Sequence, residues 1–147
     1  MLSDQLKVCL ADTFALYLKA HFFHLNIEGT DFAQYHDFFG DIYEELHGAV
    51  DLLAELVRTT GAYAPGSLGR MKELTTISDE VRVLSGIEMI QELLADNAKI
   101  TATLTQAYTA AEEVKNFAVS NVLQDRLTAH SKHAWMLRSF LKGPQHQ

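Results

Sequence analysis

Residues that could bind a metal ion are concentrated between positions 24 and 55 of the sequence. This stretch reads HLNIEGTDFAQYHDFFGDIYEELHGAVDLLAE, and its imidazoles and carboxylates are His24, His36, His47, Asp51, Glu55, Asp37, Asp41, Glu44 and Glu45. Imidazole and carboxylate groups are ligands that hard and borderline metal ions such as iron accept. Any one of these residues alone would more simply be a solvated surface residue. The whole set favours a metal site.

A single long helix over residues 32–59 is expected to carry most of this set. Asp31 suits the N-cap, no proline follows before Pro65, and Gly61 suits the C-terminal end. At about 100° per residue, one helical face would hold His36, Gly40, Glu44, His47, Asp51 and Glu55. Apolar side chains would surround that face, namely Phe38, Phe39, Ile42, Leu46, Val50, Leu53 and Leu56. The helix would thus pack against a core and present a row of ligands.

The spacing of these residues resembles the signature of the Dps family, the ferritin-like mini-ferritins that protect DNA in starved cells. That signature is His, eleven residues, His, three residues, Asp, ten residues, Asp, three residues, Glu. The chain has four of the five ligands, at His24, His36, Asp51 and Glu55. Gly40 stands where the first Asp would fall. The resemblance therefore implies an iron site with one ligand missing.

The likeness extends over nearly the whole chain. It includes the segments AELVRTTGAYAPGSL (54–68) and HAWMLRSFL (133–141), while Leu25 replaces the Trp of the family's HWN motif. The resemblance implies an all-α fold: a ferritin-like, antiparallel four-helix bundle with a short helix in the middle crossover. We expect residues 1–147 to form a single domain of this kind.

The resemblance also implies that each iron site is shared between two subunits. In the family the two histidines and the first Asp come from one chain, and the second Asp and the Glu come from its twofold mate. Two antiparallel copies of the long helix, with their axis near Glu45 and Leu46, would place His36 opposite the partner subunit's Glu55. Position 40 would then face the partner subunit's Asp51. Two iron ions are expected per site, with zinc as an alternative occupant.

Two residues are candidates to replace the ligand missing at Gly40. In the antiparallel pairing Glu44 faces the partner subunit's His47, and both lie about one helical turn, roughly 5–6 Å, from the empty position. Asp37 and Asp41 are weaker candidates because they point further round the helix. The alternative interpretation is that Gly40 weakens the site, so that one iron binds. In the extreme case, the oxidation of iron is lost, and the hollow shell of subunits that the family forms serves only as a metal-binding or structural assembly.

The remaining elements follow from apolar periodicity and from helix stop signals. Helices are expected over residues 3–27, 68–75, 86–111 and from 114 or 116 to 142. The expected N-caps are Ser3 or Asp4 for the first helix and Ser85 or Ser78 for the third. The histidines outside the ligand pattern are expected to be structural: His21, His130 and His133. Three acidic residues of the third helix are expected to form a solvated face: Glu88, Glu92 and Asp96.

Composition limits the other classes of function. The 147 residues carry a net charge of −7 with pI near 5.4, which argues against a basic nucleic-acid surface and predicts no strong DNA binding. The last segment, KGPQHQ, holds one lysine, unlike the lysine-rich tails with which the family often binds DNA. Cys9 is the single cysteine, and no membrane span or signal peptide is apparent, so we expect a cytoplasmic protein.

The resemblance to the Dps family implies a ferroxidase that oxidises Fe(II), with hydrogen peroxide as the oxidant that the family favours. The resemblance further implies a hollow dodecamer that stores ferric mineral. One alternative is a di-iron site inside a single bundle, which would need two Glu-x-x-His motifs. The long helix supplies one, from Glu44 to His47, and the later helices supply none. Another alternative is a Dps-like shell that has kept assembly and lost oxidation.

Overall fold

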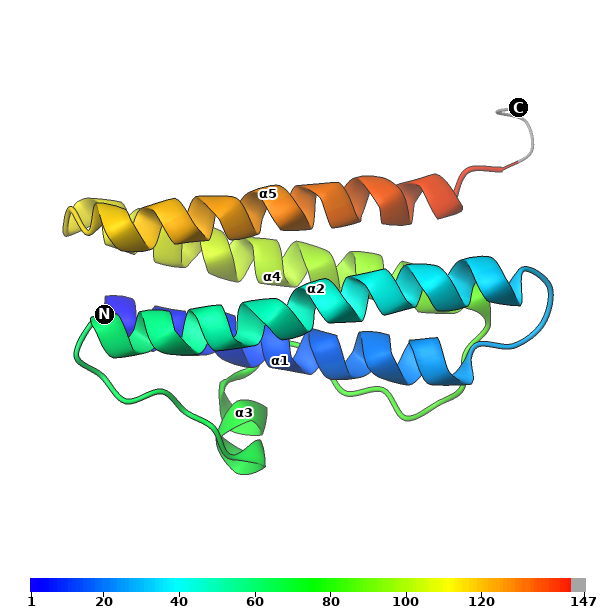
Figure 1. Ribbon diagram of the computed structural model, residues 1–147, viewed down its shortest axis with the longest axis horizontal. Helices are drawn as coiled ribbons and strands as arrows, with labels where there is room; N and C mark the ends of the chain where they lie inside the picture. The colour runs from blue at the N-terminus through cyan, green and yellow to red at the C-terminus, as the bar shows by residue number, and fades with distance from the viewer. Residues whose placement is uncertain (144–147) are drawn as a thin grey trace.

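The structure is a computed structural model that describes residues 1–143, and this part of the chain folds into five helices without strands (Figure 1). The helices are α1 (Leu2–Asn26), α2 (Phe32–Thr59), α3 (Leu68–Leu74), α4 (Gly86–Glu113) and α5 (Phe117–Phe140). The expected all-α bundle with a short helix in the middle crossover is confirmed. Across residues 1–143, no helix combines the length and the apolar character needed to cross a membrane.

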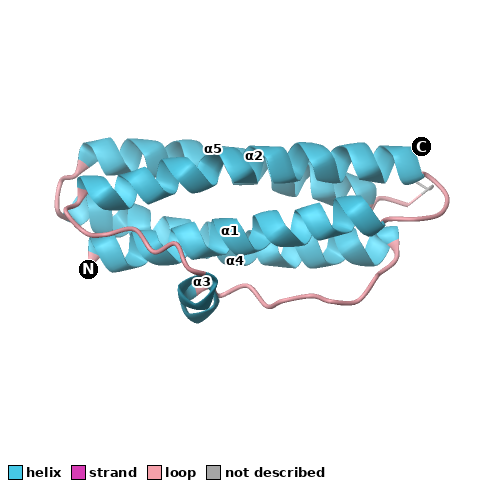
Figure 2. Ribbon diagram, turned by 60° about the horizontal axis from the view of Figure 1, so that its bottom comes forward, coloured by secondary structure: helices cyan, strands magenta, loops and turns pink. Residues whose placement is uncertain are grey.

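The four long helices form two hairpins that pack against each other. Helices α1 and α2 make one hairpin and α4 and α5 the other, while α1 packs along α4 between them (Figures 1 and 2). Helices α2 and α5 approach each other at only a few positions. The crossover from α2 to α4 runs along the bundle and carries α3 against α1. Along α2, the side chains of Glu44, His47, Asp51, Leu52 and Glu55 are exposed.

The core between the hairpins is built from large apolar side chains on every long helix. The fully buried ones include Leu6, Leu10, Phe23, Phe39, Leu46, Leu53, Ile90, Leu93, Ile100, Leu104 and Leu123. Burial of a side chain of this size stabilises a fold by about 1.5–3 kcal/mol. Because Phe23 lies near the end of α1 and Phe39 near the start of α2, the same core fixes the region where the candidate ligands lie.

The helix ends confirm some of the expected caps and correct another. Helix α2 begins and ends where predicted, and Ser85 forms a capping box with Glu88 at the start of α4. The prediction that Ser3 or Asp4 caps α1 is wrong, since Met1 occupies the N-cap position. Acidic residues also favour the first turn of a helix, so Asp4 alone does not mark the cap.

A buried carboxylate ties the crossover to the bundle. Asp12 of α1 is fully buried and accepts hydrogen bonds from the hydroxyl of Thr75 at 2.7 Å and from the N–H and hydroxyl of Thr76 at 2.7 and 2.9 Å. The hydroxyl of Thr103 on α4 donates to the same carboxylate at 2.9 Å. Asp12 therefore joins α1, α4 and the segment that follows α3.

A buried ion pair corrects part of the expectation of a solvated acidic face on α4: Glu88 is exposed as expected, but Glu92 and Asp96 are paired with Lys19. Lys19 of α1 donates to Asp96 at 2.7 Å and to Glu92 at 2.9 Å, and Asp96 is only 3% exposed. The four-residue spacing of these acidic residues does not distinguish a solvated helical face from a buried one. Lys19, which lies on another helix, stabilises these two carboxylates, because a buried charge needs an oppositely charged, hydrogen-bonded partner.

We expect Asp12→Ala to lower the free energy of unfolding by about 3 kcal/mol or more, because four donors would lose a buried, charged acceptor. Denaturation by urea at a fixed protein concentration measures this loss. The exposed Asp4→Ala is the control, and it should lose less than about 1 kcal/mol, the contribution of an acidic residue in the first turn of a helix. A loss below about 1 kcal/mol for Asp12→Ala would show that the crossover is held by other contacts.

Candidate metal centre

Two histidines meet where α1 ends and α2 begins. The rings of His24 and His36 stack with their centroids 3.8 Å apart and an interplanar angle of 20°. Each ring places Nδ1 against the backbone carbonyl of the other residue, at 2.7 Å for His24 and 2.8 Å for His36. A carbonyl only accepts, so in each neutral ring Nδ1 carries the proton. Nε2 then keeps a free lone pair, as a metal ligand requires.

A short turn and a third ring hold this pair in place. The connection between the helices contains Gly29 with φ of +97° and Asp31 with φ of +65°. Both lie in the left-handed region that lets the chain reverse within a few residues. Asp31 occupies the expected N-cap position, but its side chain makes no capping hydrogen bond. The ring of Phe32 stacks on His36 at 5.0 Å. The histidines are thus oriented before any metal arrives.

The two carboxylates of the predicted set lie further along α2. Asp51 and Glu55 are exposed and lie one turn apart. A hydrogen bond with Asp51 raises the pKa of Glu55, and the charge of Asp51 and slight desolvation add to this. Like charges this close disfavour double ionisation unless a cation lies beside them. The pair is therefore suited to accept a positive ion.

One copy of the chain does not bring the two pairs together. His36 and Asp51 lie fifteen positions apart on the same helix, which corresponds to about 22 Å along its axis. Within residues 1–143, no group of three His, Cys, Asp or Glu side chains converges closely enough to hold a metal ion. The structure thus separates the four candidate ligands into two pairs, called here the two half-sites of the predicted centre: His24 with His36, and Asp51 with Glu55.

The ring of His24 lies close to the position of the missing ligand. A Cβ atom added to Gly40 would lie 3.2 Å from Cε1 and 3.3 Å from Nδ1 of His24. The candidate replacements Glu44 and His47 are exposed on α2, and the ring of His47 lies 5.0 Å from that of Tyr17. Within one chain, neither is part of the histidine pair.

His21 lies beside this site, within a cluster of aromatic rings. Its ring centroid is 4.5 Å from that of Tyr43 and 6.2 Å from that of His24. Tyr43 also lies 5.1 Å from His24. These contacts agree with the expected structural role of His21, since its ring packs among aromatic side chains.

Sequence reasoning missed a polar network in the seam between α2 and α5. Arg126 is 5% exposed, and its guanidinium pairs with both carboxylate oxygens of Glu45. Arg126 also contacts Nε2 of His130 at 3.2 Å, and Nδ1 of His130 lies 2.7 Å from the side-chain oxygen of Asn97. His133 completes the network, 3.4 Å from Glu45. His130 and His133 are buried packing residues, as expected.

The ionisation of this network follows from burial and from Arg126. Burial alone would raise the pKa of Glu45, but the hydrogen bond and the charge of Arg126, together with the charge of His133, lower it overall. Burial lowers the pKa of His130 well below its ordinary value, and the charges of Arg126 and His133 act in the same direction. Arg126 is thus the cation that balances Glu45, so an intrachain di-iron site would have to displace a guanidinium.

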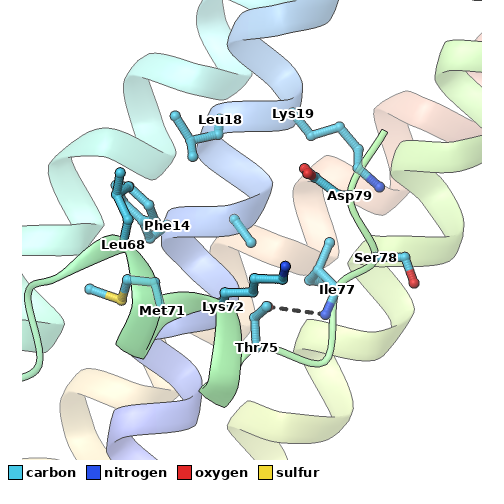
Figure 3. Close-up of a pocket in the computed structure, with 11 residues that line it drawn as sticks. Phe14, Leu18, Lys19, Leu68, Met71, Lys72, Thr75, Ile77, Ser78 and Asp79 are labelled. Carbon is cyan, nitrogen blue, oxygen red and sulfur yellow. Dashed lines mark hydrogen bonds between the residues drawn. The ribbon is translucent and has the colours of Figure 1, made fainter. Parts of the chain in front are cut away.

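A pocket of about 400 Å³ lies apart from the histidine pair, between α1, α3 and the crossover (Figure 3). Phe14, Leu18, Leu68 and Met71 make much of its wall. Lys19 also reaches it, but its ammonium is already paired with Glu92 and Asp96. With Asp79 as the one carboxylate in its lining, this pocket does not resemble a metal site.

Comparisons with known proteins agree with this fold. A family model described as a ferritin-like domain matches residues 3–145. A DNA protection during starvation protein from Brevibacillus brevis is 31% identical over 133 residues, 90% of this chain and 89% of that protein. The crystal structure of a Dps protein from Bacillus brevis matches with a TM-score of 0.92 and 30% identity, over 96% of this chain and 95% of that one.

A further solved structure connects this fold with di-iron chemistry. A Dps protein from Vibrio cholerae O1, described as a member of a broad superfamily of ferritin-like diiron-carboxylate proteins, matches with a TM-score of 0.93. The two are 26% identical, and the match covers 96% of this chain and 89% of that one. The similarity to Dps proteins therefore extends over nearly the whole chain.

The seam network predicts that stability falls in mild acid. The pKa of His130 is lowered in the folded chain. Below pH 6.5, His130 therefore binds a proton in the unfolded chain but stays neutral in the folded chain. We expect a loss of roughly 1.4 kcal/mol per pH unit below that point for each such histidine. The lowered pKa of Glu45 acts in the same direction at lower pH.

Urea denaturation between pH 7 and 5 measures how the free energy of unfolding depends on pH. The slope of this dependence should be smaller for His130→Gln than for the wild type, and unchanged for the exposed Ser131→Ala. Equal slopes in all three proteins would contradict this assignment.

Proposed function

We propose that this chain, which belongs to the Dps family of ferritin-like proteins, binds and oxidises Fe(II) at sites shared between two subunits and stores the ferric product inside a hollow shell. The family supports iron storage and ferroxidase chemistry in general. The proposal for this chain rests on His24, His36, Asp51 and Glu55.

The separation of the two half-sites is the observation that carries the proposal. Two nitrogen ligands alone, or two carboxylates alone, bind iron weakly, and one chain holds them about 22 Å apart on a straight helix. An antiparallel second copy of α2 would bring His24 and His36 to Asp51 and Glu55 of the partner subunit. A twofold interface repeats each contact, so one dimer would contain two such sites.

Each pair has a distinct part in the chemistry. The Nε2 atoms of His24 and His36 supply nitrogen ligands whose tautomers are already set by the backbone carbonyls. The partner subunit's Asp51 and the partner subunit's Glu55 supply negative charge, which favours Fe(III) over Fe(II). The repulsion between these two neighbouring carboxylates would be relieved when the cation binds. Two Fe(II) ions, as substrate, provide the two electrons that reduce one hydrogen peroxide to two waters, with two protons taken up.

A site for two ions needs a further ligand, because Gly40 offers none. We propose that His47 or Glu44 of the facing helix takes this part, directly or through water. Both are exposed on the same face of α2 as the other ligands, which supports this assignment. The alternative function, a shell with weakened oxidation, is favoured by Gly40 itself and would leave one ion per site. Zinc would suit the same nitrogen and oxygen ligands.

The assembly and its surroundings are proposed from the family. A closed dodecamer in the cytoplasm would provide the hollow interior for ferric mineral. The net charge of −7 argues against strong DNA binding at physiological salt, because contacts with DNA phosphates depend on clustered Lys and Arg. The same negative charge favours the approach of cations.

Anaerobic Fe(II) titration followed by peroxide tests the ligand set. We expect saturation at two ions per site, and we expect Glu55→Ala to slow the fast phase of ferric absorbance by about 100-fold. One of the variants His47→Ala and Glu44→Ala, whichever removes the replacement ligand, should reduce binding to one ion per site. If His47→Ala still binds two ions, His47 is not the replacement ligand. If Glu55→Ala oxidises iron as fast as the wild type, the proposed site is wrong.

Mixed shells test whether the site is shared. One chain carries His24→Ala with His36→Ala, and the other carries Asp51→Ala with Glu55→Ala. Each alone should lack fast oxidation. Shells co-assembled from both should regain about a quarter of the wild-type rate, since half of randomly formed dimers are mixed and each has one intact site of two. Mixed shells that assemble fully but recover no activity would contradict a shared site.

A further inference from the structure

Two tyrosines lie beside the candidate histidine ligands, one on each helix of the α1–α2 hairpin. The ring centroid of Tyr43, on α2, is 5.1 Å from that of His24. The ring centroid of Tyr17, on α1, is 6.2 Å from that of Tyr43 and 5.0 Å from that of His47. Aromatic rings in contact have centroids about 4.5–7 Å apart. A continuous row of rings therefore connects His24 with His47, and Tyr43 is the tyrosine that contacts the proposed ligand.

Tyr43 is placed to take part in oxidation and not only in packing. Its side chain is half-buried, so the ring contacts His24 and His21 while solvent still reaches part of the residue. A phenol is among the most easily oxidised side chains of a protein, because the unpaired electron that remains is shared between the oxygen and the ring. Loss of one electron also releases the phenolic proton, which water can accept. Tyr43 is therefore a source of one electron within ring contact of His24.

The number of electrons available at the site depends on how many Fe(II) ions it holds. Hydrogen peroxide takes up two electrons and two protons to become two waters, and each Fe(II) supplies one electron. A site holds a single ion while it fills, and it keeps a single ion if no residue replaces the ligand that is missing at Gly40. One electron alone would split peroxide into hydroxide and a hydroxyl radical. A site with one ion therefore needs a second electron donor.

We propose that Tyr43 supplies the second electron whenever a site holds a single Fe(II). Fe(II), hydrogen peroxide, the phenol of Tyr43 and one proton from solvent then give Fe(III), a neutral tyrosyl radical and two waters. The O–O bond of peroxide breaks, and the phenol provides the other proton that the two waters require. A later Fe(II) returns the radical to tyrosine, with one proton taken up, so Tyr43 is not consumed. This inference rests on the proposed function, because it takes His24 to bind the iron that is oxidised.

Electron paramagnetic resonance of the assembled protein, frozen soon after peroxide is added, tests this inference. Fe(II) is added without oxygen at one ion for every two sites, so that sites with a single ion predominate. We expect the wild type to give a tyrosyl radical signal, which narrows when the protein contains ring-deuterated tyrosine. Tyr43→Phe keeps the ring but removes the oxidisable hydroxyl, so this variant should lose the signal and release more hydroxyl radical to a spin trap.

Matched variants separate this inference from the proposed function. Tyr17→Phe removes the neighbouring phenol beside His47, and Tyr63→Phe removes an exposed phenol beyond the end of α2, so both should keep the wild-type signal. A signal that persists in Tyr43→Phe, or that disappears in Tyr17→Phe, would overturn the role of Tyr43 while leaving the proposed site intact. So would a wild type that oxidises iron rapidly at this loading without forming the radical. Fast iron oxidation in Glu55→Ala would overturn the proposed site, and with it the inference.

Discussion

The rigidity of helix α2 is the constraint on which the candidate site depends. A continuous helix keeps His36 and Asp51 at a fixed separation of about 22 Å, so folding of one chain does not bring them together. The α1–α2 turn completes one half-site by placing His24 on His36. The other half-site needs only the one-turn spacing of Asp51 and Glu55. Helix length thus makes assembly of two copies a condition for the proposed chemistry, and binding of metal and association of subunits should be thermodynamically linked.

The interior of the bundle is stabilised by carboxylates that are paired with cations of the protein. Glu45 points into the seam between α2 and α5, yet its charge is balanced by Arg126. Asp96 is balanced in the same way by Lys19. Once these carboxylates are paired with buried cations of the protein, they are poor ligands for a metal ion. The free imidazole nitrogens and unpaired carboxylates of the predicted set lie instead on the α1–α2 hairpin, which a second copy can reach.

Local signals predicted the helices, and contacts between helices account for what sequence analysis missed. The bounds of α2 and the Ser85 cap follow from residues a few positions apart, so they were predicted correctly. The burial of Asp96 depends on Lys19, and the network around Arg126 depends on Glu45 and Asn97, all distant in sequence. The ligand spacing identified the histidine pair, but its contact with Gly40 arises only when the two helices pack. The pairing of the two half-sites is still a prediction.

Anomalous X-ray diffraction at the iron edge, from crystals of the assembled protein soaked anaerobically with Fe(II), tests the shared site most directly. The account predicts iron density within coordination distance of Nε2 of His24 and His36 and of the carboxylates of the partner subunit's Asp51 and the partner subunit's Glu55. Iron bound inside one bundle, beside Glu45 and His133, would contradict it. So would crystals that contain the twofold dimer but show no iron between the two half-sites.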